Sequence, residues 1–169
     1  MCSRPHRSRL PIVALAAAGL LAACGGGQTL SKDEYVLRMQ EIQQDPGGQT
    51  EALGSAMANP QLPDRRWKRV AEEWLKRQRA ALEKTRDLRP PSDISKAHQR
   101  YVDESARWLG SMERLVKDVE GGSVPRGKLE TRAERLGAEY AERVGPVAEE
   151  IESAGYDVFQ PFNGSSQTS

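Results

Sequence analysis

Apolar side chains recur at helical spacing along most of the chain. From Asp64 to Leu88 they return every three or four residues, and the charged residues between them fall on the opposite side. The members of this first stripe are Trp67, Val70, Ala71, Trp74, Gln78, Ala81, Leu82, Thr85 and Leu88. The pattern predicts a long amphipathic helix whose tryptophans face a core.

Two more stripes follow, each set off by residues that break helices. The segment "RPPSD" ends the first helix because two prolines cannot continue it, and Ser92 is a suitable N-cap for the next. The segment "EGGSVPRG" then separates the second stripe from the third. The second stripe comprises Ile94, His98, Tyr101, Ser105, Trp108, Leu109, Met112, Val116 and Val119, and the third comprises Leu129, Ala133, Leu136, Tyr140, Val144, Val147 and Ile151.

Shorter helical patterns precede the three long ones. Ser31 and Glu34 have the spacing of a capping box and open a helix with Tyr35, Met39 and Ile42 on one face. The turn-rich segments "DPGGQ" and "NPQLPD" enclose a weak helical segment around residues 51–57.

Together these elements predict an all-α fold. Short links between long amphipathic helices favour antiparallel neighbours, so we expect an up-and-down helical bundle of three long helices plus a shorter N-terminal helix, over residues 31–160. After the last helix, aromatic and aliphatic residues are positioned to pack back on the bundle, and residues 161–169 form a flexible tail. The residues that would pack back are Tyr156, Val158, Phe159 and Phe162.

The N-terminal segment has a different character. Arg4, Arg7 and Arg9 supply positive charge, and an apolar run of about fourteen residues, from Leu10 to Ala23, follows them. This run is shorter than the roughly twenty residues that a membrane-spanning helix needs. A charged start, a short apolar stretch and small residues at its end are typical of a secretory signal.

The end of this run resembles the lipobox of bacterial lipoprotein precursors. That motif is Leu, a small residue, Gly or Ala, then Cys, and "LAAC" at residues 21–24 fits every position. The resemblance implies a signal peptide over residues 1–23, cleavage between Ala23 and Cys24, and acyl chains such as palmitate on Cys24. Residues 24–30 would form a Gly-rich tether, and the domain would lie on the extracytoplasmic face of the cell membrane. The alternative is an uncleaved membrane anchor in which the cysteine is incidental.

The mature part also resembles a group of small exported helical proteins from high-GC bacteria, whose function is unassigned. The segments that carry this resemblance are "LSKDEYVLRMQEIQQ", "LRPPSD" and "ESAGYDVF". Such proteins carry one cysteine late in the first helix and another near the C-terminus, consistent with a disulfide. Here Gln43 or Gln44 and Phe159 stand near those places, so the resemblance implies that hydrophobic packing replaces the covalent link.

Charge and cysteine content narrow the possible functions. The chain has 25 basic and 24 acidic residues, and removal of Arg4, Arg7 and Arg9 with the signal leaves 22 basic residues against 24 acidic ones. A nearly neutral domain argues against general binding of nucleic acid. Of the two cysteines, Cys2 leaves with the signal and Cys24 is lipidated, so no thiol remains for a disulfide or a metal.

Candidate chemistry centres on one histidine. His98 is the only histidine that remains after signal removal, so the sequence contains no multi-histidine metal set, and we predict no catalytic residues, no metal and no cofactor. On the second stripe, His98 is either a hydrogen-bonded core residue or part of a small polar pocket. That pocket would combine His98, Tyr101 and Ser105 with Tyr35 or Tyr140 from a facing helix.

Two classes of function follow from these interpretations. The first is a non-enzymatic lipoprotein that binds an envelope protein or polymer, and the alternative is a bundle that binds a small ligand around His98. The basic segment "DRRWKRVAEEWLKRQR" adds one more choice. Either it lies against anionic headgroups, or Trp67 and Trp74 face the core and the basic side chains form a solvated face. The matching apolar stripes of the other long helices favour the second interpretation.

Overall fold

The computed structural model describes residues 29–44, 47–59 and 61–159. These residues contain five α-helices and one short 3-10 helix, and no strand occurs among them. The helices are α1 (Lys32–Gln44), α2 (Gly47–Ala58), α3 (Asp64–Asp87), α4 (Ser95–Glu120), η1 (Arg126–Lys128) and α5 (Leu129–Ser153). The predicted all-α class is confirmed.

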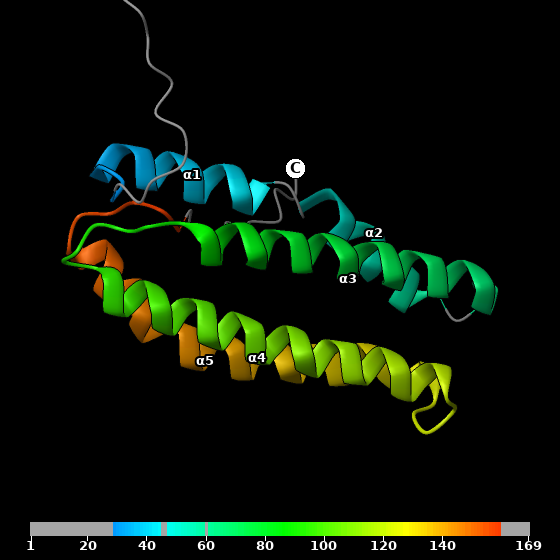
Figure 1. Ribbon diagram of the computed structural model, residues 1–169. Coiled ribbons are helices and arrows are strands. Elements are labelled where there is room, and N and C mark those ends of the chain that lie inside the picture. The colour runs from blue at the N-terminus through cyan, green and yellow to red at the C-terminus, as the bar shows by residue number, and fades with distance from the viewer. Residues whose placement is uncertain (1–28, 45–46, 60, 160–169) are drawn as a thin grey trace, which may run out of the picture.

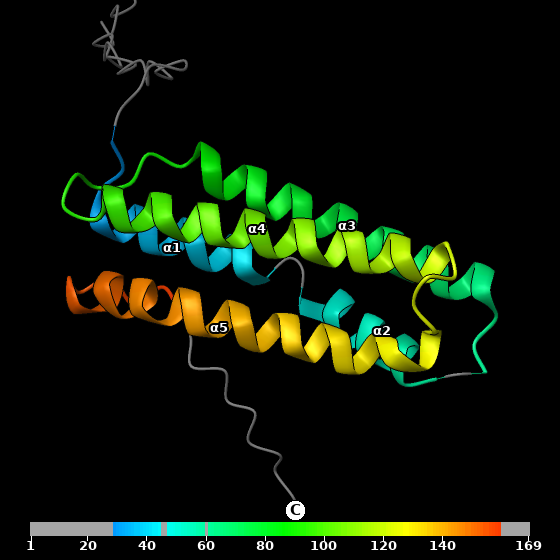
Figure 2. The same ribbon diagram turned by 90° about the horizontal axis from the view of Figure 1, so that it is seen from below.

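The three long helices form an up-and-down bundle, and the two short helices share its fourth position. Figures 1 and 2 show α3, α4 and α5 side by side, with α1 and α2 following one another along the remaining side. Both short helices pack against α3, and α2 also packs against α5. The weak helical segment around residues 51–57 is therefore a full helix that completes a four-helix arrangement.

The buried side chains form two separate clusters, one toward each end of the bundle. The first cluster joins α2 with the N-terminal half of α3 and the C-terminal half of α4. Trp67 and Trp74 belong to it and are each 2% exposed, so the prediction that they face the core is confirmed. The second cluster joins α1 with the start of α4, the end of α5 and the segment after α5. Each short helix thus covers one cluster.

The start of α1 follows its predicted capping pattern. The Ser31 backbone N–H donates a hydrogen bond to Glu34 Oε2 at 3.0 Å, and the Glu34 N–H donates to Ser31 Oγ at 3.4 Å. These reciprocal bonds satisfy two of the amide groups that a helix start leaves without partners.

The start of α4 differs from the prediction. Ile94 is the N-cap residue, so the expected capping role of Ser92 is wrong. The Ile94 side chain is 2% exposed within the second cluster, and this burial fixes where the chain enters the helix. The Ser92 carbonyl instead accepts a hydrogen bond from Ser95 Oγ at 3.1 Å.

The end of α5 turns the chain back onto the bundle. Gly155 has a φ of 86°, a conformation that suits glycine. The Tyr156 N–H donates to the Ile151 carbonyl at 3.2 Å and the Gly155 N–H to the Glu152 carbonyl at 2.7 Å, which is the Schellman pattern. This turn buries Tyr156 and Val158, with Phe159 packed beside them, and confirms that these three residues pack back.

The structure also places the beginning of the described chain. The Leu30 N–H donates a hydrogen bond to the Arg89 carbonyl at 2.9 Å, and the Leu30 side chain packs on the second cluster. Leu30, which falls in the predicted tether, is thus part of the bundle. The predicted signal peptide, Cys24, most of the tether, Phe162 and the predicted tail lie outside the described residues.

Within the described part of the chain, no helix combines the length and the apolar character that crossing a bilayer requires.

Removal of a tryptophan from the first cluster tests this packing. Trp74→Ala should lower the free energy of unfolding by roughly 3–5 kcal/mol, because burial is lost and a cavity remains. Chemical denaturation of residues 29–169 measures this, and Lys76→Ala, on the exposed side of the same helix, should change the value by less than about 0.5 kcal/mol. Equal effects of the two substitutions would mean that α3 is packed the other way round.

Candidate functional site

His98 lies on α4 beside the second cluster and contacts α1 through Tyr35. Its side chain is 4% exposed, and its Nδ1 atom lies 3.0 Å from the hydroxyl of Tyr35, which is fully buried. The two rings meet edge to face with centroids 5.6 Å apart, and the Tyr35 ring meets Tyr156 in the same way at 5.7 Å. His98 therefore occupies a packed position between helices far apart in sequence.

The hydrogen bonds of His98 favour its neutral form. In the tautomer that carries the ring proton on Nε2, Nδ1 accepts a hydrogen bond from the Tyr35 hydroxyl. Nε2 is buried and makes no hydrogen bond of regular geometry within the described chain. Burial lowers the pKa of His98, and the nearby Thr85 carbonyl opposes this only in part.

Tyr101 and Ser105 follow on the same face of α4 but bind a different helix. Ser105 Oγ lies 3.0 Å from the hydroxyl of Tyr140 on α5, and the Tyr101 hydroxyl also interacts with Tyr140. The Tyr101 ring packs against Phe159 with centroids 5.2 Å apart. Both of the tyrosines predicted as alternative partners therefore make contacts: Tyr35 with His98, and Tyr140 with Ser105.

These polar groups bind one another and hold the helices together. Burial raises the pKa of Tyr35, Tyr101 and Tyr140, so all three phenols keep their protons at neutral pH. Protonated phenols donate hydrogen bonds and supply no general base. The arrangement is suited to fixing α1 and α5 on α4.

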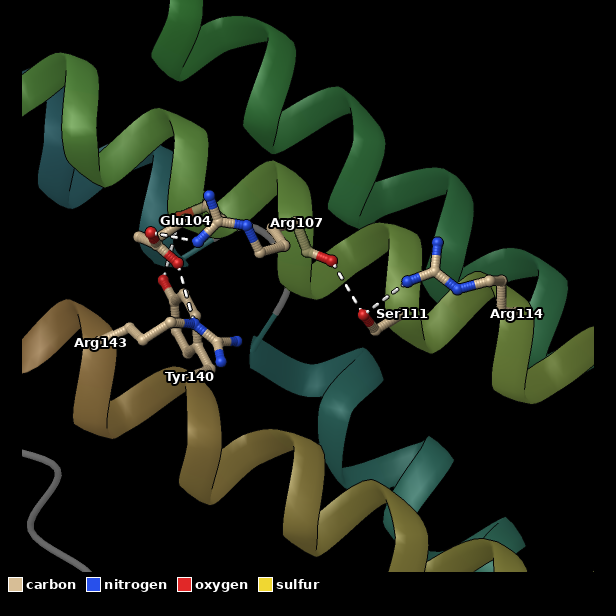
Figure 3. Close-up of polar contacts among 7 residues, drawn as sticks. Glu104, Arg107, Ser111, Arg114, Tyr140 and Arg143 are labelled. Carbon is tan, nitrogen blue, oxygen red and sulfur yellow. Dashed lines mark hydrogen bonds and ion pairs between the residues drawn. The ribbon is translucent and has the colours of Figure 1, made fainter.

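A charged group covers the same α4–α5 seam from outside. Figure 3 shows Glu104 between Arg107 of α4 and Arg143 of α5. Arg143 Nε donates to Glu104 Oε2 at 2.9 Å, and Arg107 pairs with the other carboxylate oxygen. The carboxylate of Glu104 is engaged on both sides, which suits a structural link between the two helices better than proton transfer.

A surface hollow of about 390 Å³ lies at the opposite end of the bundle. None of the three predicted pocket residues lines it. It is formed where the start of α3 meets the end of α4 and the connection to α5. Its lining residues are Asp64, Arg65, Trp67, Lys68, Val119, Glu120, Gly122, Val124, Pro125 and Arg126.

Arg126 closes this end of the bundle. Its guanidinium donates to the carbonyls of Leu62 and Asn59, the latter at 3.0 Å, and to the Asp64 carboxylate at 3.0 Å. It also lies 5.9 Å from the centroid of the Trp67 ring. Arg126 therefore holds the α2–α3 connection against the α4–α5 connection.

Sequence reasoning missed several of these residues. Arg126 lies in a turn segment, where periodicity gives no information about tertiary partners. Asp93 was missed for the same reason, although both of its carboxylate oxygens lie 3.0 Å from the Tyr156 hydroxyl. Thr85 stood in the first apolar stripe, but nothing in that stripe indicated its place beside His98.

Metal binding has no visible site in the described part of the chain. No group of three or more histidine, cysteine, aspartate or glutamate side chains is arranged there to hold an ion.

The lowered pKa of His98 predicts how stability depends on pH. Below about pH 6.5 the unfolded chain takes up a proton at His98 before the folded chain does, so the free energy of unfolding should fall as the pH drops from about 7 to 5. In His98→Leu this dependence should flatten, as measured by denaturation at each pH. The pKa of Glu34 is lowered from 4.5 by its hydrogen bonds with Ser31, so Glu34 affects the free energy of unfolding at lower pH than His98 does. If the free energy of unfolding of His98→Leu depends on pH as steeply as that of the wild type, His98 is not the group responsible.

Comparison with known proteins adds no constraint to these interpretations. The chain matches no protein-family model, no curated protein and no solved structure. Its function is therefore inferred from the sequence and the geometry described above.

Proposed function

We propose that the protein is a membrane-anchored bacterial lipoprotein whose extracytoplasmic helical bundle binds an envelope partner or polymer without catalysing a reaction. The lipobox at residues 21–24 supports the anchor. That motif is the observation that carries the proposal, and the Leu30 amide, bonded to Arg89 only six residues after Cys24, determines which end of the bundle the anchor would lie near.

This short separation has a geometric consequence for the anchored protein. Six residues span at most about 20 Å when fully extended. Acyl chains on Cys24 would therefore keep the α3–α4 connection, the start of α1 and the end of α5 close to the membrane. The hollow beside Arg126 would lie at the far end, roughly 35 Å away along the 24-residue α3.

The interior supports a binding role in preference to a catalytic one. Tyr35 directs its hydroxyl group to the buried His98, the part-buried Ser105 and Tyr140 direct theirs to each other, and Glu104 is held between two arginines. These groups already bind other side chains of the domain. The charged and polar groups that a partner could contact therefore lie on the outer surface of the helices.

Fatty-acid labelling in the native host tests the anchor. Wild-type protein should incorporate an acyl analogue, whereas Cys24→Ala should accumulate as an unlabelled precursor because the acceptor thiol is gone. Cys2→Ala is the matched control, since it removes the other cysteine and should leave labelling unchanged. Labelling of Cys24→Ala at the wild-type level would refute lipidation at this residue.

A second candidate function is binding of a small polar ligand at the His98 face of α4. The observation that favours it is the buried Nε2 atom, which has the Thr85 carbonyl nearby but makes no hydrogen bond of regular geometry, so an acceptor on a ligand would compete with that carbonyl. Small molecules extracted from the envelope should then raise the melting temperature of the wild type but not of His98→Leu. Equal shifts for both proteins, or none, would exclude this candidate.

A further inference from the structure

The outward side of α3 carries a row of cations near the hollow. Arg65, Arg69 and Lys76 are exposed and lie within about 40° of one another around the helix axis, at 100° per residue. Along the axis they are separated by about 6 and 10 Å. We call these three residues the α3 row.

Acidic residues lie on the same side of α3 as this row, but the three cations of the row form no ion pair with them. None of its three side chains forms an ion pair with another described residue. Glu72 and Glu73 lie between Arg69 and Lys76 along the helix, within about one turn of both. Glu72 lies 3.8 Å from Lys68, and Asp64 lies 3.0 Å from Arg126. Glu72 and Glu73 weaken the positive field of the row, and its three cations still lack an ion-pair partner among the described residues.

The segment of α3 that contains the row is more basic than the mature chain as a whole. Residues 64–77 contain six basic and three acidic residues, whereas the predicted mature chain has 22 basic residues against 24 acidic ones. A local positive field on a slightly acidic protein attracts anions and orients them toward this side. Guanidinium groups are well matched to carboxylate and phosphate, which they can bind through two hydrogen bonds.

The row leads into the hollow at the start of α3. Arg65 belongs to both, and Lys68 lines the hollow 3.7 Å from Glu120. The helix start has no side-chain cap, so its positive end also faces this region. Asp64 and Glu120 add negative charge there, which favours contact along the row over deep insertion.

The position of the apolar residues argues against a lipid surface as the partner. Trp67 and Trp74 are buried on the opposite side of α3, so they cannot enter headgroups. Among the described residues, the large hydrophobic side chain that is exposed is Leu37, which lies on α1. The row also begins at the end of α3 remote from Leu30.

We propose that the α3 row binds an extended acidic polymer whose repeating carboxylate or phosphate groups contact Arg65, Arg69 and Lys76 in turn. Cations in line along a straight helix suit a linear chain of anionic groups. This inference rests on the proposed function, because it names the class of envelope polymer that the lipoprotein binds.

The test compares two triple variants of the full-length protein, extracted from membranes in a non-ionic detergent. The first is Arg65→Gln, Arg69→Gln and Lys76→Gln. The control is Arg86→Gln, Lys96→Gln and Arg132→Gln, which removes the same charge from exposed residues that also form no ion pair with described residues. Fluorescently labelled poly-L-glutamate and inorganic polyphosphate serve as carboxylate and phosphate probes, and binding is followed by anisotropy at several salt concentrations.

The α3-row variant should bind at least about tenfold more weakly than the wild type. The slope of its log binding constant against log salt concentration should be smaller in magnitude by about two to three. The control should remain within about twofold of the wild type. Preference for one probe identifies the anionic group. Equal losses in both variants, or binding to neither probe but to vesicles rich in anionic lipid, would overturn the proposal.

Fatty-acid labelling separates this result from the proposed anchor. A labelled protein whose α3-row variant binds like the wild type would refute the polymer site alone. If the protein takes up no label but the α3-row variant loses probe binding, the anchor would be refuted and the polymer site would stand.

Discussion

The burial of Tyr35 is the contact on which the end of the bundle nearest Leu30 depends. Its ring is fully enclosed, its hydroxyl lies 3.0 Å from His98, and its edge meets Tyr156 from the segment after α5. One side chain of a short helix thus connects α1 to α4 and to the C-terminal segment. An isolated helix of 13 residues is marginal in water, so α1 needs these tertiary contacts to persist.

The division of the core gives the two ends of the bundle different structures. At one end, the cluster around Tyr35 includes the side chain of Leu30. At the other, Arg126 joins two connections beside a hollow and the basic start of α3. If Cys24 is lipidated, the first end is fixed near the membrane and the second faces the rest of the envelope. We infer that anchoring and partner binding use opposite ends of one domain.

Periodicity predicted the long helices and the direction of Trp67 and Trp74, because each helix buries one stripe of its own sequence. It also predicted the capping box at Ser31, which involves only neighbours in the chain. It could not pair Tyr35 with His98, since these residues are 63 positions apart and several aromatic partners were equally available. The prediction of Ser92 as the N-cap of α4 was wrong because burial of Ile94 outweighed the local preference for a serine cap.

A double-mutant cycle between Tyr35 and His98 tests the central contact most directly. Tyr35→Phe removes only the hydroxyl, His98→Leu removes its hydrogen-bond partner, and the free energy of unfolding is measured for both single variants and for the double variant. If the buried hydrogen bond links α1 to α4, the two effects should be non-additive by about 1 kcal/mol or more. Additivity within about 0.3–0.5 kcal/mol would show that the two side chains stabilise the bundle independently, and would contradict this account.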